Sequence, residues 1–234
     1  MVFYTHVCVK ASRDRTPPLT VRMLRSPLLL HIPHASTRIP DDTGGEFVVD
    51  RDTLDAELLR LTDRFTDTLY GDGFPAAQTV AADVSRLVVD VERFADDALA
   101  ARALEQFGRC VMIDAHSFPV TPLPTQVDFS APPEIGIGTD AMHTSPELAL
   151  MVHTFFTDRG FTVGVNTPFA GTMVPNAYYG RDARVQSVML EVRRDLYMDE
   201  RTGDRMPGFA DVQRVLTEFR TMLEAWVLAR GSFG

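Results

Sequence analysis

The sequence predicts a single α/β domain whose mixed, mostly parallel sheet is flanked by helices, and three observations support this class. Short apolar runs typical of buried strands alternate along the chain with longer segments of helical periodicity. Several of these runs end in a polar loop, as the strands of open α/β sheets do. The length of 234 residues suits one domain with a full hydrophobic core.

The N-terminal segment differs from the rest of the chain. Residues 1–26 have mixed polarity, no clear period and the pair Pro17-Pro18. Such a segment lacks the apolar pattern that a packed element needs. We therefore expect residues 1–26 to form a poorly ordered extension and residues 27–234 to form the folded domain.

The first predicted elements are a strand and a helix. The strand is Leu28–Leu30, and the chain then turns at Pro33. Downstream, apolar side chains recur at spacings of three and four, and they are Leu54, Leu58, Leu61, Phe65 and Leu69. This spacing predicts one amphipathic helix over 52–70 that ends at Gly71.

The remaining elements alternate between strands and helices. Apolar runs predict strands over 76–81, 86–91, 109–114, 135–137, 161–165 and 187–192. Helical periodicity and capping residues predict helices over 95–107, 145–159 and 207–230. Residues 117–133 contain five of the fifteen prolines and no clear period, which predicts a loop.

Composition excludes several classes of function. The net charge of −9 argues against a nucleic-acid or anionic-membrane partner, because either usually requires a basic face. No stretch approaches the roughly 18 consecutive apolar residues of a membrane helix. The first 26 residues lack the charged start and apolar middle of a secretory signal. Cys8 and Cys110 alone imply no disulfide framework, so we expect a cytoplasmic protein.

Two histidines lie shortly after the ends of predicted strands. His34 lies in the loop after the first strand, and His116 follows the strand over 109–114. Either the two imidazoles converge on one metal ion, or each is a hydrogen-bonded loop histidine. Asp114 is a candidate for orienting the His116 ring. Neither HExxH nor the short HxxE spacing occurs, so a third metal ligand would come from elsewhere.

Three carboxylates are further candidates. Asp63 and Asp67 lie nearly opposite the leucine stripe of their predicted helix, and the pattern alone favours a solvated face over a metal site. Glu191 stands among apolar residues of the strand over 187–192. It is either a surface residue of an edge strand or a desolvated carboxylate. Desolvation would raise its pKa toward neutrality, as a general base for water requires.

Arg86 and Arg93 bracket the apolar run between them. Their guanidinium groups suit bidentate binding of a carboxylate. The alternative is salt bridging with Asp83, Asp90 or Glu92, so both interpretations stay open.

Seven segments, in order over roughly residues 28–200, resemble the N-formylglutamate amidohydrolase family. They are LLHIPHASTRIP (29–40), LTDRFTDTLY (61–70), SRLVVDVERFADD (85–97), IDAHSFP (113–119), IGIGTD (135–140), VNTPFAGTMVP (165–175) and VMLEVRRDLYMDE (188–200). The family is similar in architecture to zinc carboxypeptidases and aspartoacylases. It hydrolyses the amide of an N-acylated acidic amino acid, and its type reaction releases formate and glutamate.

The resemblance implies a metal centre. It assigns His34, Asp63 and His116 as the ligands of one zinc ion, with Asp67 as the alternative third ligand. It also implies a small-molecule partner, an N-acyl amino acid.

The resemblance also implies roles for a base and two arginines. Glu191 corresponds to the late-strand glutamate that acts as base on the attacking water. Arg93 corresponds to the arginine of the family's Asp-x-Asn-Arg segment, which holds the substrate, and Arg86 is expected to assist it. Two departures bear on substrate choice: Glu92 replaces the asparagine, and Ala95–Asp114 is shorter than the corresponding family segment.

Two other functions stay open. One is a peptide or peptidoglycan-type amidase on the same scaffold, although the sequence shows no secretory signal for a cell-wall substrate. The other is a non-catalytic binding protein derived from the family by the shortening. The presence of His34, His116 and Glu191 together argues against a site that has lost its chemistry.

Overall fold

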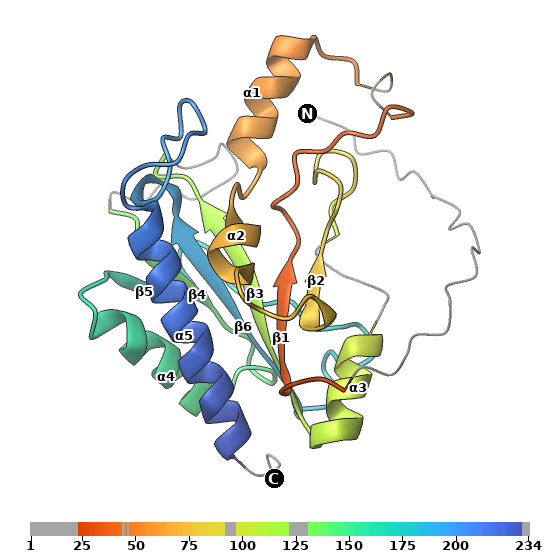
Figure 1. The fold of residues 1–234 in the computed structure, drawn as a ribbon, viewed down its shortest axis with the longest axis vertical. Coiled ribbons are helices and arrows are strands. Elements are labelled where there is room, and N and C mark those ends of the chain that lie inside the picture. Colours follow the sequence, from red (N-terminus) through yellow and green to blue (C-terminus); the bar gives the residue numbers. More distant parts are fainter. Residues whose placement is uncertain (1–22, 44, 46, 92–96, 122–130, 231–234) are drawn as a thin grey trace.

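A computed structural model describes residues 23–43, 45, 47–91, 97–121 and 131–230 (Figure 1). Its centre is a six-stranded sheet with the order β2-β1-β3-β6-β4-β5. The strands are β1 (Leu28–Ile32), β2 (Thr79–Ala81), β3 (Cys110–Phe118), β4 (Ile135–Gly138), β5 (Val163–Val165) and β6 (Val185–Arg193).

The sheet is mixed and mostly parallel. β1 pairs in parallel with β2 and β3, β3 pairs in parallel with β6, and β4 pairs in parallel with β5. Only β4 and β6 pair in the antiparallel sense among the described strands. Helices flank this sheet, so the predicted fold class is confirmed.

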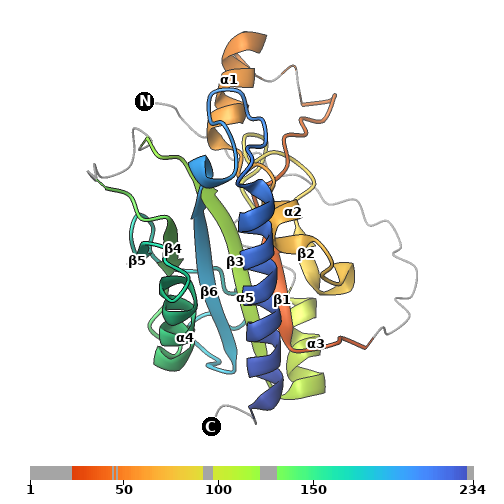
Figure 2. The ribbon, with the colours of Figure 1, turned by 60° about the vertical axis from the view of Figure 1, so that its left-hand side comes forward.

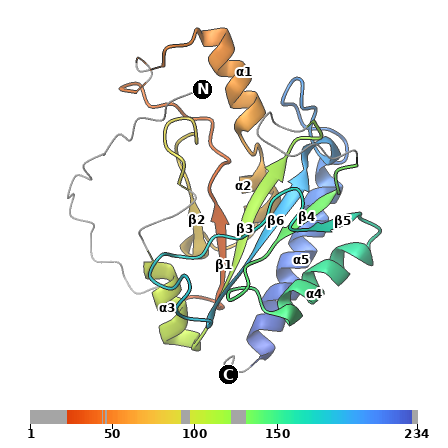
Figure 3. The ribbon, with the colours of Figure 1, turned by 180° about the vertical axis from the view of Figure 1, so that it is seen from behind.

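The sheet lies between two layers. The helices are α1 (Arg51–Leu61), α2 (Thr66–Gly71), α3 (Ala98–Phe107), α4 (Pro146–Thr157) and α5 (Phe209–Ala229). α2, α4 and α5 cover one face, and α3 lies on the other (Figures 1 and 3). α5 runs along the length of the sheet (Figure 2). Alternate residues of the strands therefore enter two separate apolar clusters, with Leu28 and Leu30 on the α5 side and Leu29 on the α3 side.

The predicted helix over 52–70 is wrong in its middle. α1 ends at Leu61 and α2 begins at Thr66, so residues 62–65 form a break. Phe65 lies in the left-handed region with φ of 68°, a conformation that no continuous helix contains. The buried leucines Leu54 and Leu58 belong to α1 and the buried Leu69 belongs to α2, so the apolar spacing continues across the break although the helix does not.

The predicted strand over 86–91 is also wrong. Residues 86–88 form a turn, in which the Val88 N–H donates to the Ser85 carbonyl at 2.9 Å and the Leu87 N–H donates to Ser85 Oγ at 3.2 Å. Ser85 is buried, so it fixes the turn from inside the fold. The other predicted elements are found within a few residues, except that β2 retains only the end of its predicted range.

Ordered packing begins before the predicted domain boundary. Leu24 is buried and donates its N–H to the Gln106 side chain, and Ser26 is buried and donates to Glu224 on α5. The prediction of a poorly ordered extension is therefore wrong for residues 24–26, because they contact α3 and α5 and lead directly into β1. Residues 1–22 lie outside the described residues. In the described part of the chain, no helix combines the length and apolarity of a membrane span.

Candidate metal centre and active site

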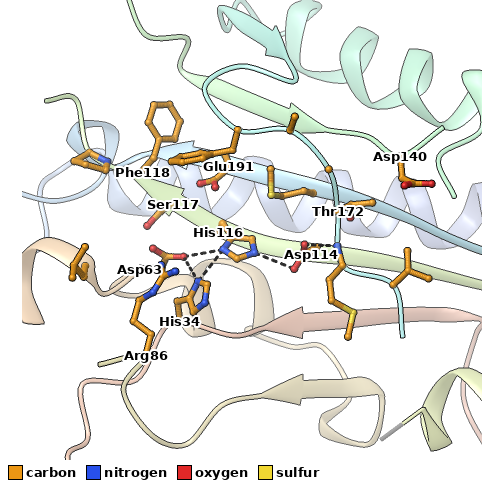
Figure 4. Close-up of a pocket in the computed structure, with 18 of the residues that line it drawn as sticks. His34, Asp63, Arg86, Asp114, His116, Ser117, Phe118, Asp140, Thr172 and Glu191 are labelled. Atoms are coloured by element: carbon orange, nitrogen blue, oxygen red, sulfur yellow. Dashed lines mark hydrogen bonds and ion pairs between the residues drawn. The ribbon is translucent and has the colours of Figure 1, made fainter. Parts of the chain in front are cut away.

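Three residues with ligand-forming side chains meet above the central strands (Figure 4). His34 follows β1 by two residues, His116 lies near the end of β3, and Asp63 lies in the break between α1 and α2. β1 and β3 are parallel neighbours, so their carboxyl ends lie at one edge of the sheet. The Asp63 N–H donates to the His34 carbonyl at 2.9 Å, which fixes the break against the loop after β1.

The three ligand atoms are spaced as a metal site requires. His34 Nδ1 lies 3.2 Å from His116 Nδ1, and Asp63 Oδ2 lies 3.1 Å from His116 Nδ1 and 3.5 Å from His34 Nδ1. A tetrahedral zinc ion with bonds of about 2.0–2.1 Å separates neighbouring ligand atoms by about 3.3 Å. All three side chains are buried, so the donor set fits one zinc ion.

The outer nitrogens of both imidazoles are held by carboxylates. His34 Nε2 lies 2.9 Å from Asp90 Oδ1, and His116 Nε2 lies 3.1 Å from Asp114 Oδ1. If each Nε2–H donates to its carboxylate, each Nδ1 presents a lone pair to the other and to Asp63. Three facing lone pairs favour a cation between them, and carboxylate-held imidazoles are typical of zinc ligands.

Charge at the site also favours a cation. Burial alone would lower the pKa of His116, but its contacts with Asp114 and Asp63 raise it well above its usual value. Burial alone would raise the pKa of Asp63, but bonds with the two histidines and the charge of Arg194 hold it far below its usual range. The carboxylates therefore stay ionised and attract either protons or a metal ion to the imidazoles.

Asp114 has further partners that fix its orientation. Its Oδ1 lies 2.7 Å from His31 Nδ1, and its Oδ2 accepts the Met173 N–H at 2.8 Å. These contacts place Asp114 where the sequence suggested, as the residue that orients His116. They also connect the three candidate metal ligands to the loop that contains Met173.

The two candidate aspartates of the predicted helix have different environments. Asp67 is exposed, and its carboxylate contacts the hydroxyl of Thr68 at 3.4 Å. Asp63 is 2% exposed, so the solvated face that the sequence pattern favoured is wrong for this residue. The reason is the helix break, which turns Asp63 inward.

Glu191 occupies the middle of the sheet, in the pocket that contains the three candidate metal ligands. β6 lies between β3 and β4, and Glu191 is in register with His116, so the edge-strand interpretation is wrong. Its side chain is buried, and Oε2 has no hydrogen-bond partner among the described residues. Burial raises the pKa of Glu191 from 4.5 to about 7. Gly136 on β4 lies opposite, and a Cβ there would stand 3.1 Å from the Glu191 Cβ.

These residues line one pocket of about 290 Å³. Its other walls include Arg86, Arg194, Phe169, Met173 and Tyr179. Arg86 lines this pocket, and it also forms one of the salt bridges left open by the sequence, with Nη2 2.9 Å from Asp90 Oδ2. Arg93 lies outside the described residues.

Sequence reasoning missed two contributors to the site. Asp90 was considered only as a partner of arginines, yet it also contacts His34. Arg194 was not considered, although its buried guanidinium lies 2.9 Å from Asp63 Oδ1. Its position directly after the strand that contains Glu191 is the signal that was available, because strand ends converge on this site.

Comparison with known proteins agrees with the fold and indicates the family. The model of the family described as N-formylglutamate amidohydrolase matches residues 26–101 and 97–198. The two matches meet within the Ala95–Asp114 segment in which the sequence suggests a shortening. No curated protein matches the chain.

Two solved structures share the fold. The crystal structure of N-formylglutamate amidohydrolase from Ralstonia eutropha JMP134 has a TM-score of 0.67 and 22% identity, over 87% of this chain and 94% of that one. The crystal structure of a gene product from Agrobacterium tumefaciens has a TM-score of 0.53 and 18% identity, over 86% and 92%. Because the family model matches well over half of the sequence, the chain belongs to the N-formylglutamate amidohydrolase family.

Proposed function

We propose that this protein is a zinc-dependent hydrolase that cleaves the amide of an N-acylated acidic amino acid such as N-formylglutamate. One observation carries the proposal: three facing ligand atoms lie in the same pocket as a buried carboxylate whose Oε2 has no hydrogen-bond partner among the described residues. Family membership supports hydrolysis of an amide. The zinc ion, the residue roles and the substrate are parts of the proposal.

His34, Asp63 and His116 would hold the zinc ion. The chemistry that zinc supplies at such a site is polarisation of the scissile carbonyl and a shift of the pKa of water from about 15.7 toward 7. Asp90 and Asp114 keep the two imidazoles in the tautomer that directs Nδ1 into the site.

Glu191 is the proposed general base. It takes a proton from the attacking water and delivers it to the departing amide nitrogen. A base works best when its pKa lies near the working pH, and burial brings the pKa of Glu191 to about 7. The absence of a hydrogen bond to Oε2 among the described residues leaves that atom available for the proton.

Arg86 and Arg93 are proposed to bind the carboxylates of the substrate. Arg86 lines the pocket, and its planar guanidinium suits a carboxylate. A pocket of about 290 Å³ suits a small molecule better than a polymer. This size favours an N-acyl amino acid over the peptidoglycan-type alternative. A cytoplasmic location and a role in amino-acid catabolism remain predictions of the proposal.

The first test is metal content. The full chain is purified without chelator, and its metals are measured by mass spectrometry against protein concentration. We expect about one zinc ion per chain in the wild type and in Asp67→Asn, and little zinc in Asp63→Asn. Asp67→Asn is the matched control because it removes the same charge on the exposed side of α2. Zinc-free wild-type protein would refute the proposed metal centre.

The second test is product release. Formate and free amino acid are measured with N-formyl, N-acetyl and N-carbamoyl derivatives of glutamate, and with N-formyl derivatives of neutral amino acids. We expect fastest release from an N-formyl acidic amino acid. A zinc-loaded protein that binds these compounds without releasing product would instead be the non-catalytic binding protein.

A further inference from the structure

Arg194 is a buried arginine whose guanidinium joins three parts of the active site. It follows β6 directly, and its side chain is 4% exposed. Nη1 donates to the Arg60 carbonyl at 2.6 Å, at the end of α1. Nε donates to Ser117 Oγ at 3.2 Å and Nη2 to the Ser117 carbonyl at 3.2 Å, at the end of β3. Nη2 also donates to Asp63 Oδ1 at 2.9 Å.

The two carboxylate oxygens of Asp63 therefore have different partners. Oδ1 accepts from Arg194, whereas Oδ2 faces the Nδ1 atoms of His34 and His116. A carboxylate that binds a metal through both oxygens would need Oδ1 to leave the guanidinium. The bond to Arg194 opposes that rotation, because both groups are buried and their charges are poorly screened.

We infer that Arg194 is a positioning residue that keeps Asp63 a monodentate metal ligand. The inference rests on the proposed zinc site. With His34, His116 and one oxygen of Asp63 as ligands, a bound zinc ion would keep one coordination position for water or substrate. A second oxygen from Asp63 would compete for that position. Arg194 thus preserves an open site without contacting the ion.

An arginine suits this position better than a lysine. Its planar fork reaches the end of α1, the end of β3 and Asp63 at the same time. Lysine has the charge but a single ammonium group, which cannot reproduce this planar set of bonds. The same guanidinium group also holds the segment between α1 and α2, from which Asp63 points into the site.

The test uses the full chain with Arg194→Met and Arg194→Lys, and with Arg193→Met as the matched control. Arg193 is the preceding residue, and it contacts Asp195 and the Pro132 carbonyl rather than Asp63. Zinc affinity is measured by competition with a chelator, and the visible absorption of the Co²⁺-substituted protein reports coordination number. Four-coordinate Co²⁺ absorbs more strongly than five- or six-coordinate Co²⁺.

We expect Arg194→Met to weaken zinc binding by about 10–100-fold and to reduce the Co²⁺ absorption, since residues that orient metal ligands have effects of this size. Arg194→Lys should fall between Arg194→Met and wild type, and Arg193→Met should match wild type. Combining Arg194→Met with Asp63→Asn should add little to Asp63→Asn alone, because the arginine acts through that aspartate.

Three results would overturn the inference. Unchanged zinc affinity and Co²⁺ absorption in Arg194→Met would remove the positioning role while leaving the proposed function intact. Additive losses in the double variant would show that Arg194 acts independently of Asp63. Loss of the folded state in both Arg194 variants, judged by circular dichroism, would assign Arg194 to stability alone. A wild type without bound metal would instead refute the proposed function itself.

Discussion

Replacing Glu191 with Gln should reduce turnover and stabilise the metal-free protein at the same time. Glutamine keeps the shape of the side chain but cannot accept the proton of the attacking water. Turnover should therefore fall by two to four orders of magnitude, or about 100–10,000-fold, which is the contribution of general acid–base catalysis. Substrate affinity should change little, because the proposed zinc and arginine contacts remain.

The gain in stability follows from the burial of Glu191. Burial raises its pKa from 4.5 to about 7, and each pKa unit corresponds to about 1.4 kcal/mol. Ionised Glu191 thus costs the folded state about 3 kcal/mol at pH 8. Glutamine removes this cost but buries an amide without a clear partner, at about 1–2 kcal/mol. A net gain of about 1–2 kcal/mol should raise Tm by about 2–8 °C for a chain of this size.

The pH dependence provides the check. Well below pH 4.5, the carboxyl is largely neutral in both the folded and unfolded states, so the wild type carries little penalty there. The penalty develops as pH rises from 4.5 to about 7 and is complete above that range. Thermal melts of both proteins in chelator should show a higher Tm for the Gln variant than for the wild type at pH 8 but not at pH 5. An equal difference at both pH values would refute the assigned pKa, and near-normal turnover of the variant would refute the assigned base.

Two further predictions concern substrate binding by Arg93 and the N-terminal segment of the chain. Arg93→Lys keeps the charge of the side chain but loses the planar guanidinium group. It should therefore raise KM, measured by product release, more for substrates with an α-carboxylate than for neutral amide analogues. Equal effects on both kinds of substrate would argue against carboxylate binding by Arg93. A chain that starts at Met23 should have a Tm within a few degrees of that of the full chain. The reasons are that residues 1–22 show no apolar periodicity and that the family match begins at residue 26. A large fall in Tm would show that residues 1–22 pack on the domain.

The sequence was sufficient to predict most of the sheet, because buried strands require apolar runs that are visible in one dimension. It also predicted that His34, His116 and Glu191 belong together, since each lies in or directly after a central strand. The strand predicted over 86–91 was wrong because a short apolar run is equally compatible with a strand and with a turn that buries a few side chains. Only the buried Ser85 and its hydrogen bonds decide between them.

Asp63 could be assigned only through the family resemblance, because its position depends on a backbone feature that the apolar pattern does not encode. The extended backbone of Thr62 ends α1, and the left-handed Phe65 precedes α2, without disturbing the leucine spacing. The ring of Phe65 packs edge-on against Phe209, and the Arg205 guanidinium lies over both rings. These partners come from far along the chain, so local sequence contains no signal for the break or for the inward turn of Asp63.

The strand order has a consequence for hydrogen exchange. His34 follows β1, and His116 and Glu191 lie in β3 and β6. These three strands are adjacent in the centre of the sheet, whereas the outer strands β2 and β5 contain three residues each. Amides of short edge strands open by local fluctuations, while central amides exchange mainly through global unfolding. Opening of either edge should therefore leave the reactive groups in place. We therefore expect the slowest-exchanging amides to lie in the strands next to the active-site residues.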